Sequence, residues 1–180
     1  MPDLVAKTPM ASWDPVTIGA ASVAEISPGP MASLSAFGHA SALAAALEDA
    51  HGLAWPAPGQ SRVAGDVRCI WFGLRDVLLM GTFPDAALSR HGAVVDQSDA
   101  WAVVSLSGSS AVDVLARLVP IDLRDSAFGV DATARTQLGH MQCSITKLRT
   151  DCFMIMVFRS MAGTLYHDLT DAMAGVAARG

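Results

Sequence analysis

The sequence predicts an α+β fold in which helices pack on a mainly antiparallel sheet. Its basis is a strand, a glycine turn and a helix that occur twice in the 180 residues, at 33–53 and at 104–123. Strands in hairpin connection and then another helix follow each copy, which favours antiparallel pairing. Each strand-helix-strand-strand-helix half is too small to bury both faces alone, so we expect two pseudo-repeated halves around one core.

The second copy is the clearest local pattern in the chain. Residues 101–106 are typical of a strand, residues 107–109 of a glycine turn, and residues 110–118 carry apolar side chains at helical spacing. Ser109 or Ser110 is expected to cap this helix through its hydroxyl. Pro120 ends it, because proline has no N–H and clashes with the preceding turn.

Residues 1–20 are expected to form an extended N-terminal arm, because Pro2, Pro9 and Pro15 interrupt any regular element. The arm carries Trp13, and a free tail would seldom carry a tryptophan. We therefore expect the arm to lie on an apolar surface of this chain or of a neighbour. Residues 21–180 then form a single α+β domain of two halves, about 21–95 and 96–180.

In the first half, the alanine-rich stretch with Leu43 and Leu47 on one face predicts a helix that Gly52 ends. Pro84 at a first helical position and Gly92 beyond the last one favour a second, short helix. A turn at 73–76 between two apolar runs predicts a hairpin. The expected elements are strands at 21–26 and 31–37, a helix at 39–51, a loop at 53–65, strands at 67–72 and 77–81, a helix at 84–91 and a strand at 93–96.

In the second half, three strands and a long helix follow the central unit. The strands are expected at 133–138, 141–148 and 151–158, after a loop at 122–131. The last helix, at 160–178, is amphipathic, and Ser160 is its expected cap. Its apolar face is formed by Leu165, Leu169, Ala172, Met173 and Val176.

The composition excludes several classes of function. Residues of the hydrophobic type make up 52% of the chain and charged residues 16%, so we favour apolar surface that a partner covers over an unusually full core. The net charge is −5 and the 12 Lys and Arg residues are scattered, which argues against nucleic acid as a partner. No apolar run approaches the ~20 residues that span a membrane. We see no signal peptide and expect a cytoplasmic protein.

We identify no catalytic, cofactor-binding or metal-binding residue in the sequence. The three cysteines lie in apolar strand contexts without metal-ligand spacing, and the five histidines have neither HxH nor HExxH spacing. The serines at 105–110 do not match a nucleophile motif, and no phosphate-binding glycine loop is present. Asp96, Asp99 and Asp122 are interpreted as turn and cap residues.

A partner interface is the functional reading that the remaining side chains favour. Trp, Tyr and Arg dominate the energetic hot spots of protein interfaces. Five such residues lie in the arm, near strand ends or at the start of the last helix. These candidate interface residues are Trp13, Trp101, Arg135, Arg159 and Tyr166, and ordinary packing is the alternative for each of them.

Three stretches make the chain similar to a known family. They are DQSDAWAVVSLSG with the helix exit LxxLxPxDL (residues 96–123), ARTQLGHM (134–141) and FRSMAGTLYHDL (158–169). Together they resemble the gamma subunit of heterotetrameric sarcosine oxidase over roughly residues 71–172. The family's fold is like that of the folate-binding aminomethyltransferases, which agrees with the two expected halves.

The resemblance implies a complex of alpha, beta, gamma and delta subunits that demethylates sarcosine to glycine, with hydrogen peroxide as a product and tetrahydrofolate as one-carbon acceptor. It implies FAD, FMN, NAD, zinc and tetrahydrofolate in the partner subunits and no cofactor on this chain. The alpha subunit is the expected direct contact.

Two alternatives remain open at the level of sequence. The chain could be a subunit of a related N-methyl amino acid oxidase or dehydrogenase. It could also be a stand-alone folate or one-carbon binding protein, in which a carboxylate such as Asp96, Asp99 or Asp122 would face the pterin ring.

Overall fold

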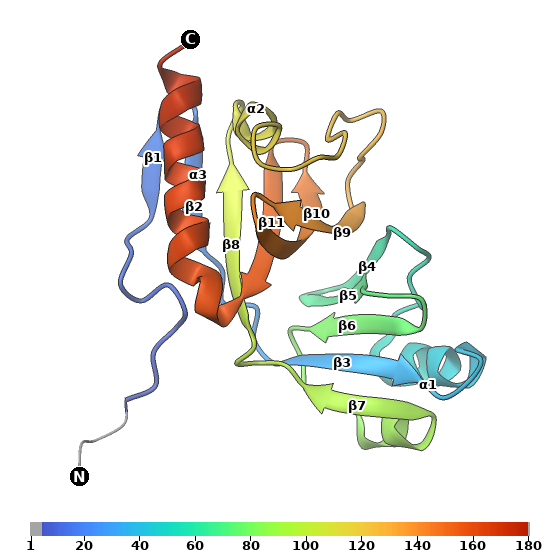
Figure 1. The fold of residues 1–180 in the computed structure, drawn as a ribbon. Helices are drawn as coiled ribbons and strands as arrows, with labels where there is room; N and C mark the ends of the chain where they lie inside the picture. The colour runs from blue at the N-terminus through green and yellow to red at the C-terminus, as the bar shows by residue number, and fades with distance from the viewer. Residues whose placement is uncertain (1–4, 180) are drawn as a thin grey trace.

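The larger of two antiparallel sheets is formed by residues 16–25 and 101–158. In this computed structural model, which describes residues 5–179, its strand order is β1-β2-β8-β11-β10-β9 (Figure 1). One face is covered by α2 (Ala111–Leu115) and α3 (Ala162–Ala177), and Leu115, Leu165 and Phe153 are buried between them and the sheet. The strands are β1 (Val16–Ile18), β2 (Ala21–Glu25), β8 (Trp101–Ser107), β9 (Thr133–Leu138), β10 (Met141–Arg149) and β11 (Cys152–Phe158).

The smaller sheet is formed by the segment between β2 and β8. Its order is β4-β5-β6-β3-β7, and all its pairs are antiparallel. The helix α1 (Ser41–His51) and the 3-10 helix η1 (Ala86–Arg90) cover one face, where Leu43, Leu47 and Leu88 are fully buried. The strands are β3 (Met31–Ala36), β4 (Ser61–Ala64), β5 (Val67–Trp71), β6 (Asp76–Met80) and β7 (Gly92–Asp96).

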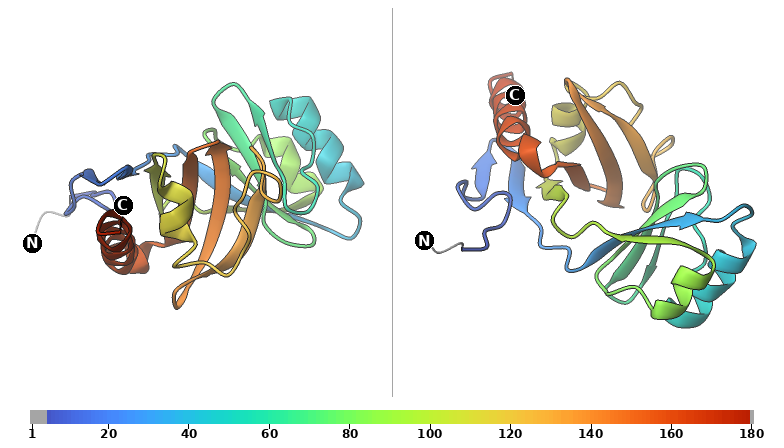
Figure 2. Two further views of the ribbon diagram at one scale, coloured as in Figure 1. Left: turned by 90° about the horizontal axis from the view of Figure 1, so that it is seen from above. Right: turned by 60° about the horizontal axis from the view of Figure 1, so that its bottom comes forward.

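The two sheets face each other with the sides that carry no helix. The core between them contains Met31 and Leu78 from the smaller sheet and Trp101, Val103 and Met156 from the larger. Figures 1 and 2 show the strands of the two sheets running in clearly different directions, with the helices on the outside. The layers are thus helix, sheet, sheet and helix, and the predicted α+β class is confirmed.

The expected repeat is visible in the order of the strands. In the smaller sheet β3 is followed by a helix and a meander of three strands that returns to its side, and in the larger sheet β8 is followed in the same way. On its other side β3 pairs with β7, whereas β8 pairs with β2 in the corresponding position. We expected β2 in the half at 21–95, but it pairs with the half at 96–180. The division into domains itself stays a prediction.

Several local predictions were wrong. The expected arm contains the strand β1. The expected loop at 53–65 contains the strand β4, whose sequence SRVA shows no clear alternation of apolar and polar residues. The short helix expected at 84–91 is present as the 3-10 helix η1, which Asp85 caps. The central helix is regular only over α2. Neither Ser110 nor Ser160 makes a capping side-chain bond, and a 3-10 turn, η2 (Arg159–Met161), precedes α3.

The apolar excess of the composition lies largely inside the molecule. Three separate cores, one between each sheet and its helices and one between the sheets, bury most of the large apolar side chains, while Phe37, Leu74 and Phe83 are among those that stay exposed. Within the described residues, no helix is both long and apolar enough to cross a membrane.

Replacing Met156 by alanine is expected to lower the free energy of unfolding by about 2 to 5 kcal/mol, because its fully buried side chain fills the core between the sheets. Urea unfolding of the purified chain measures this change. The exposed Leu74 is the control, and Leu74→Ala should change the free energy by less than about 0.5 kcal/mol. Equal effects of both substitutions would contradict the packing of the two sheets.

The thiols of Cys69 and Cys143 are expected to resist modification in the folded chain. Burial raises the pKa of each to about 12, so only roughly one in 10,000 molecules carries either thiolate at pH 8. A colorimetric thiol reagent should react with them only after urea unfolds the chain. Because the folded pKa is raised, the free energy of unfolding should fall as the pH rises above about 8.5, the pKa of an unfolded thiol. Rapid labelling in the absence of urea would contradict the burial.

Candidate functional site at the junction of the two sheets

The chain crosses between the sheets twice, at residues 26–30 and 97–100, and the two crossings lie side by side. The Gln97 N–H donates to the Met31 carbonyl at 2.8 Å, and the Met31 N–H donates to the Ser98 hydroxyl at 3.1 Å. The Ile26 N–H donates to the Val103 carbonyl at 2.8 Å. These bonds hold the two crossings together at the place where the chain passes from one sheet to the other.

A row of aromatic rings continues this junction across both sheets. Phe72, which follows β5, meets the Trp101 ring edge-on with centroids 5.4 Å apart, and Trp101 stacks on Phe158 at 4.8 Å. On the other side, the Arg135 guanidinium lies 4.1 Å above the Phe72 ring and donates to the Phe72 carbonyl at 3.2 Å. Such ring pairs and cation contacts add to the energy of burial alone. The row therefore connects the smaller sheet to β8, β9 and β11 of the larger sheet.

Residues 5–15, which we call the N-terminal segment, pack against β2 and α3 beside this junction. The Thr8 hydroxyl and the Met10 N–H both donate to the Glu25 carboxylate, at 2.7 and 3.0 Å. The Trp13 ring packs against Tyr166 of α3 with centroids 5.9 Å apart. The expectation that Trp13 lies on an apolar surface is thus met within the chain, and residues 1–4 of the expected arm lie outside the described residues.

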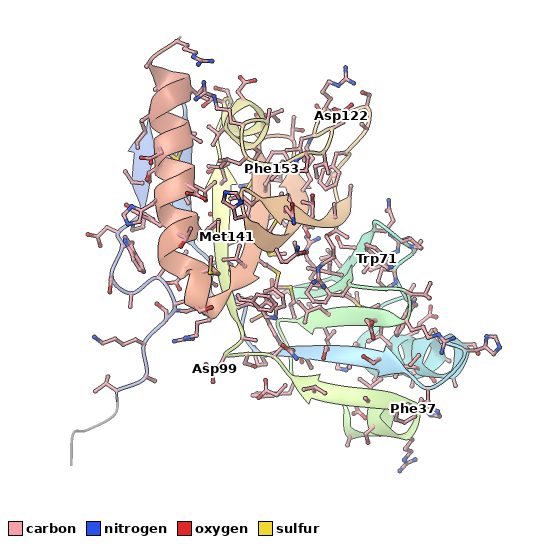
Figure 3. All side chains as sticks on the ribbon, viewed as in Figure 1. Phe37, Trp71, Asp99, Asp122, Met141 and Phe153 are labelled. Carbon is pink, nitrogen blue, oxygen red and sulfur yellow. The ribbon has the colours of Figure 1, made fainter. Side chains whose placement is uncertain are left out.

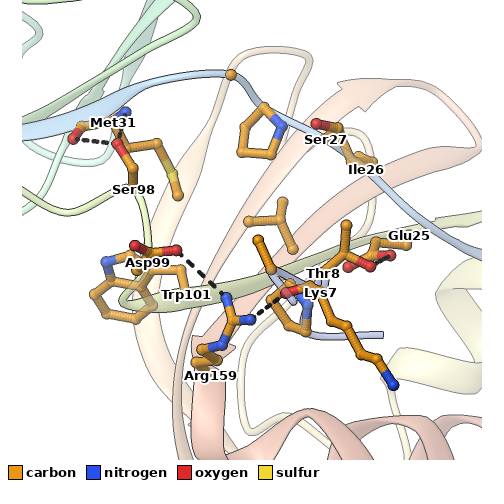
Figure 4. A pocket seen from close by; sticks show the side chains of 15 residues that line it. Lys7, Thr8, Glu25, Ile26, Ser27, Met31, Ser98, Asp99, Trp101 and Arg159 are labelled. Atoms are coloured by element: carbon orange, nitrogen blue, oxygen red, sulfur yellow. Dashed lines mark hydrogen bonds and ion pairs between the residues drawn. The ribbon is translucent and has the colours of Figure 1, made fainter. Parts of the chain in front are cut away.

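A pocket of about 290 Å³ opens between the N-terminal segment and the two crossings (Figure 4). The Arg159 guanidinium bridges it, because it donates to the Lys7 carbonyl and lies 3.6 Å from the Asp99 carboxylate. Trp101 forms part of the wall, and its buried indole N–H has no hydrogen-bond partner in the described structure. The pocket thus offers cationic, anionic and aromatic groups to a contacting surface.

The structure places the five candidate interface residues in two groups. Trp13 and Tyr166 pack together, and Arg159 lies at the pocket beside the same N-terminal segment. Trp101 and Arg135 flank Phe72 in the aromatic row. Trp101 is only 6% exposed, whereas Phe158 on top of it is 47% exposed. Most contacts of these residues are therefore within the chain, and a role in a partner interface stays a prediction.

The three aspartates considered for a pterin ring do not come together. Figure 3 shows Asp99 at the junction and Asp122 on the loop above β9 and β10. Asp96 accepts bonds from the Ser98 hydroxyl and N–H, which lower its pKa. Asp122 accepts bonds from the Arg124 side chain and N–H, which lower its pKa to about 2. Asp96 and Asp122 are thus bound by residues two positions further on, as the turn interpretation predicts, whereas the exposed Asp99 carboxylate lies 3.6 Å from the Arg159 guanidinium.

Within residues 5–179, no three His, Cys, Asp or Glu side chains are grouped closely enough to hold a metal ion. The core between the sheets is filled by large apolar side chains, mainly methionines, isoleucine and leucine.

Sequence reasoning missed the residues that hold the junction together. Phe72 and Glu25 appeared as ordinary strand-end residues, although each is the common partner of two others. Lys147 is fully buried on β10, with its ammonium directed to Asp125 and lying 5.2 Å from the Phe153 ring. The only available signal was a lysine at an inward position of an apolar strand.

A family model described as the sarcosine oxidase gamma subunit family matches residues 37–175. A chain of the heterotetrameric sarcosine oxidase from Corynebacterium sp. U-96, solved in complex with pyrrole 2-carboxylate, is 25% identical and superposes with a TM-score of 0.83 over 96% of each chain. No curated protein sequence matches.

A second solved structure shares the fold alone. Aminomethyltransferase T of the glycine cleavage system from Bartonella henselae is 17% identical, with a TM-score of 0.58, and the match covers 85% of this chain and 46% of that chain. The family model, in contrast, spans well over half of the sequence, and the sarcosine oxidase chain agrees with it over nearly the full length. The chain belongs to the sarcosine oxidase gamma subunit family.

Proposed function

We propose that this gamma subunit has a structural role in a heterotetrameric sarcosine oxidase and performs no catalytic step itself. The match of the gamma family model to residues 37–175 carries the proposal. The geometry supports it, because the titratable side chains at the junction are bound to neighbours in the chain and do not converge on a common point.

The reaction of the complete complex is proposed from the family. Sarcosine loses two electrons at its N-methyl carbon, molecular oxygen takes them up and becomes hydrogen peroxide, and glycine remains after the one-carbon unit passes to tetrahydrofolate. FAD, FMN, NAD, zinc and tetrahydrofolate are proposed to belong to the partner subunits. We assign no step of this chemistry to a residue of this chain, and the proposed location is the cytoplasm.

The alpha subunit is the proposed direct contact, with beta and delta completing the complex. The face that we assign to alpha contains the half-exposed Phe158 ring, the Arg159 guanidinium and Tyr166. Aromatic and arginine side chains that are already held by their own chain lose little conformational freedom on binding, which favours them as interface anchors.

Co-expression with the subunits encoded beside it is expected to yield a yellow complex. We would tag this chain, purify it in one step, and record the visible absorption and the sarcosine-dependent release of peroxide. Flavin bands together with peroxide release support the proposal. A colourless chain that elutes alone in the presence of all partner subunits would overturn it.

Arg159→Ala is expected to lower the flavin absorbance recovered with the tagged chain about tenfold, because the guanidinium connects the pocket rim to the N-terminal segment. The free energy of unfolding of the isolated chain should fall by less than about 1.5 kcal/mol, since the bonds are partly exposed. Arg149→Ala, at the exposed last position of β10, is the matched control and should recover full absorbance. Full recovery with Arg159→Ala would remove this face from the interface.

A further inference from the structure

One end of the smaller sheet gathers exposed side chains from three separate segments. The Ala36 N–H donates to the Arg75 carbonyl at 3.1 Å, and the Phe37 N–H donates to the His91 carbonyl at 3.3 Å. The end of β3, the turn before β6 and the approach to β7 are therefore bonded side by side. We call this surface the basic end, and it consists of Phe37, His39, Leu74, Arg75, Arg90 and His91, all of them exposed.

The apolar part of the basic end is large for an exposed surface. Phe37, which directly follows β3, is 67% exposed, and Leu74, in the turn before β6, is 91% exposed. Neighbouring exposed apolar side chains of this size are a feature of interaction sites. Figure 3 shows Phe37 at the edge of the molecule, beyond the tip of β3.

The charge of the basic end is opposite to that of the chain. The chain carries a net charge of −5, yet Arg75 and Arg90 lie here together, and neither takes part in an ion pair within residues 5–179. The helix α1 begins at the same end and has no acidic residue in its first turn, so its partial positive charge is not offset. Of the nearby acidic residues, Glu48 and Asp85 lie toward the opposite end, at the end of α1 and the start of η1. Asp76, at the start of β6, follows Arg75 and is also close enough to Arg135 to act on its charge, so the two arginines outnumber the acidic groups at this end.

We propose that the basic end docks on an acidic surface of another subunit of the oxidase, with Phe37 and Leu74 as apolar anchors and Arg75 and Arg90 as the charged rim. This rests on the proposed function, because the partner is a subunit of that complex. A symmetric contact with a second copy would bring the same arginines against each other, which like charges disfavour.

The basic end is also remote from the face assigned to the alpha subunit. In Figure 2, the N-terminal segment and α1 lie on opposite sides of the molecule. The smaller sheet can therefore contact one neighbour while the N-terminal segment contacts another, and the chain would connect two surfaces of the complex.

The test uses the co-expressed complex with the tag on this chain. Phe37→Ser with Leu74→Ser, and separately Arg75→Glu with Arg90→Glu, should each lower the flavin recovered per tagged chain at least about tenfold. Arg75→Lys with Arg90→Lys should retain it, because the rim acts through charge. Raising the salt to about 0.5 M should weaken the wild-type association and leave the Glu variant little changed.

The controls separate the outcomes. Phe83→Ser removes a 77% exposed phenylalanine at the other end of the smaller sheet, and Arg149→Glu reverses a charge elsewhere, so both should assemble fully. Equal urea midpoints of all variants show that the fold is intact. Full assembly of the basic-end variants overturns this inference and leaves the proposed function standing, whereas failure of the wild-type chain to assemble overturns both. A dimer of the isolated chain that the Ser variant dissociates, without an effect on assembly, would assign the surface to self-association.

Discussion

Each of the two sheets is apolar on both faces, and the structure depends on this constraint. Along β8 and β11, Val104 and Ile155 face the helices, while Val103 and Met156 face the other sheet. Helices cover only one face of each sheet, so the other face has to be covered by the neighbouring sheet. At roughly 25 cal/mol per Å² of buried apolar area, leaving these faces in water would remove more free energy than a domain of this size has to spare.

Polar side chains also connect the two sheets, because charged and backbone groups at the edge of the contact require hydrogen-bond partners. Asp131 is held with a positive φ of 63°, and its carboxylate accepts from Arg68 at 2.7 Å and lies near the Ser61 hydroxyl. This connects the strand edge of β4 and β5 to the start of β9. Lys147 holds the preceding loop through Asp125 in a comparable way. Such pairs contribute modest net stability. The Arg68–Asp131 pair also fixes the relative position of the two sheets, whereas Lys147 and Asp125 both belong to the segment of the larger sheet.

This arrangement divides the aromatic, arginine and large apolar side chains into two sets. Trp101, Arg135 and Phe72 stabilise the chain's own junction, although tryptophan and arginine are typical interface residues. Phe37 and Leu74 are exposed instead, at an end of the smaller sheet that the internal packing does not use, and Phe158 has both roles because it stacks on Trp101 and is 47% exposed. A rigid chain with apolar anchors on separate sides can associate with partners at a small entropic cost.

The sequence by itself determined the α+β class, most strands and the helices α1 and α3, because periodicity of apolar residues reports which face of an element is buried. It also led to the family through the stretches at 96–123, 134–141 and 158–169. Only the tertiary structure decided that β2 joins the sheet of the second half, that β4 exists, and that Phe72 and Glu25 organise the junction. Pairing between distant strands and contacts between side chains far apart in the chain depend on the packing of the whole molecule, and no local pattern encodes them.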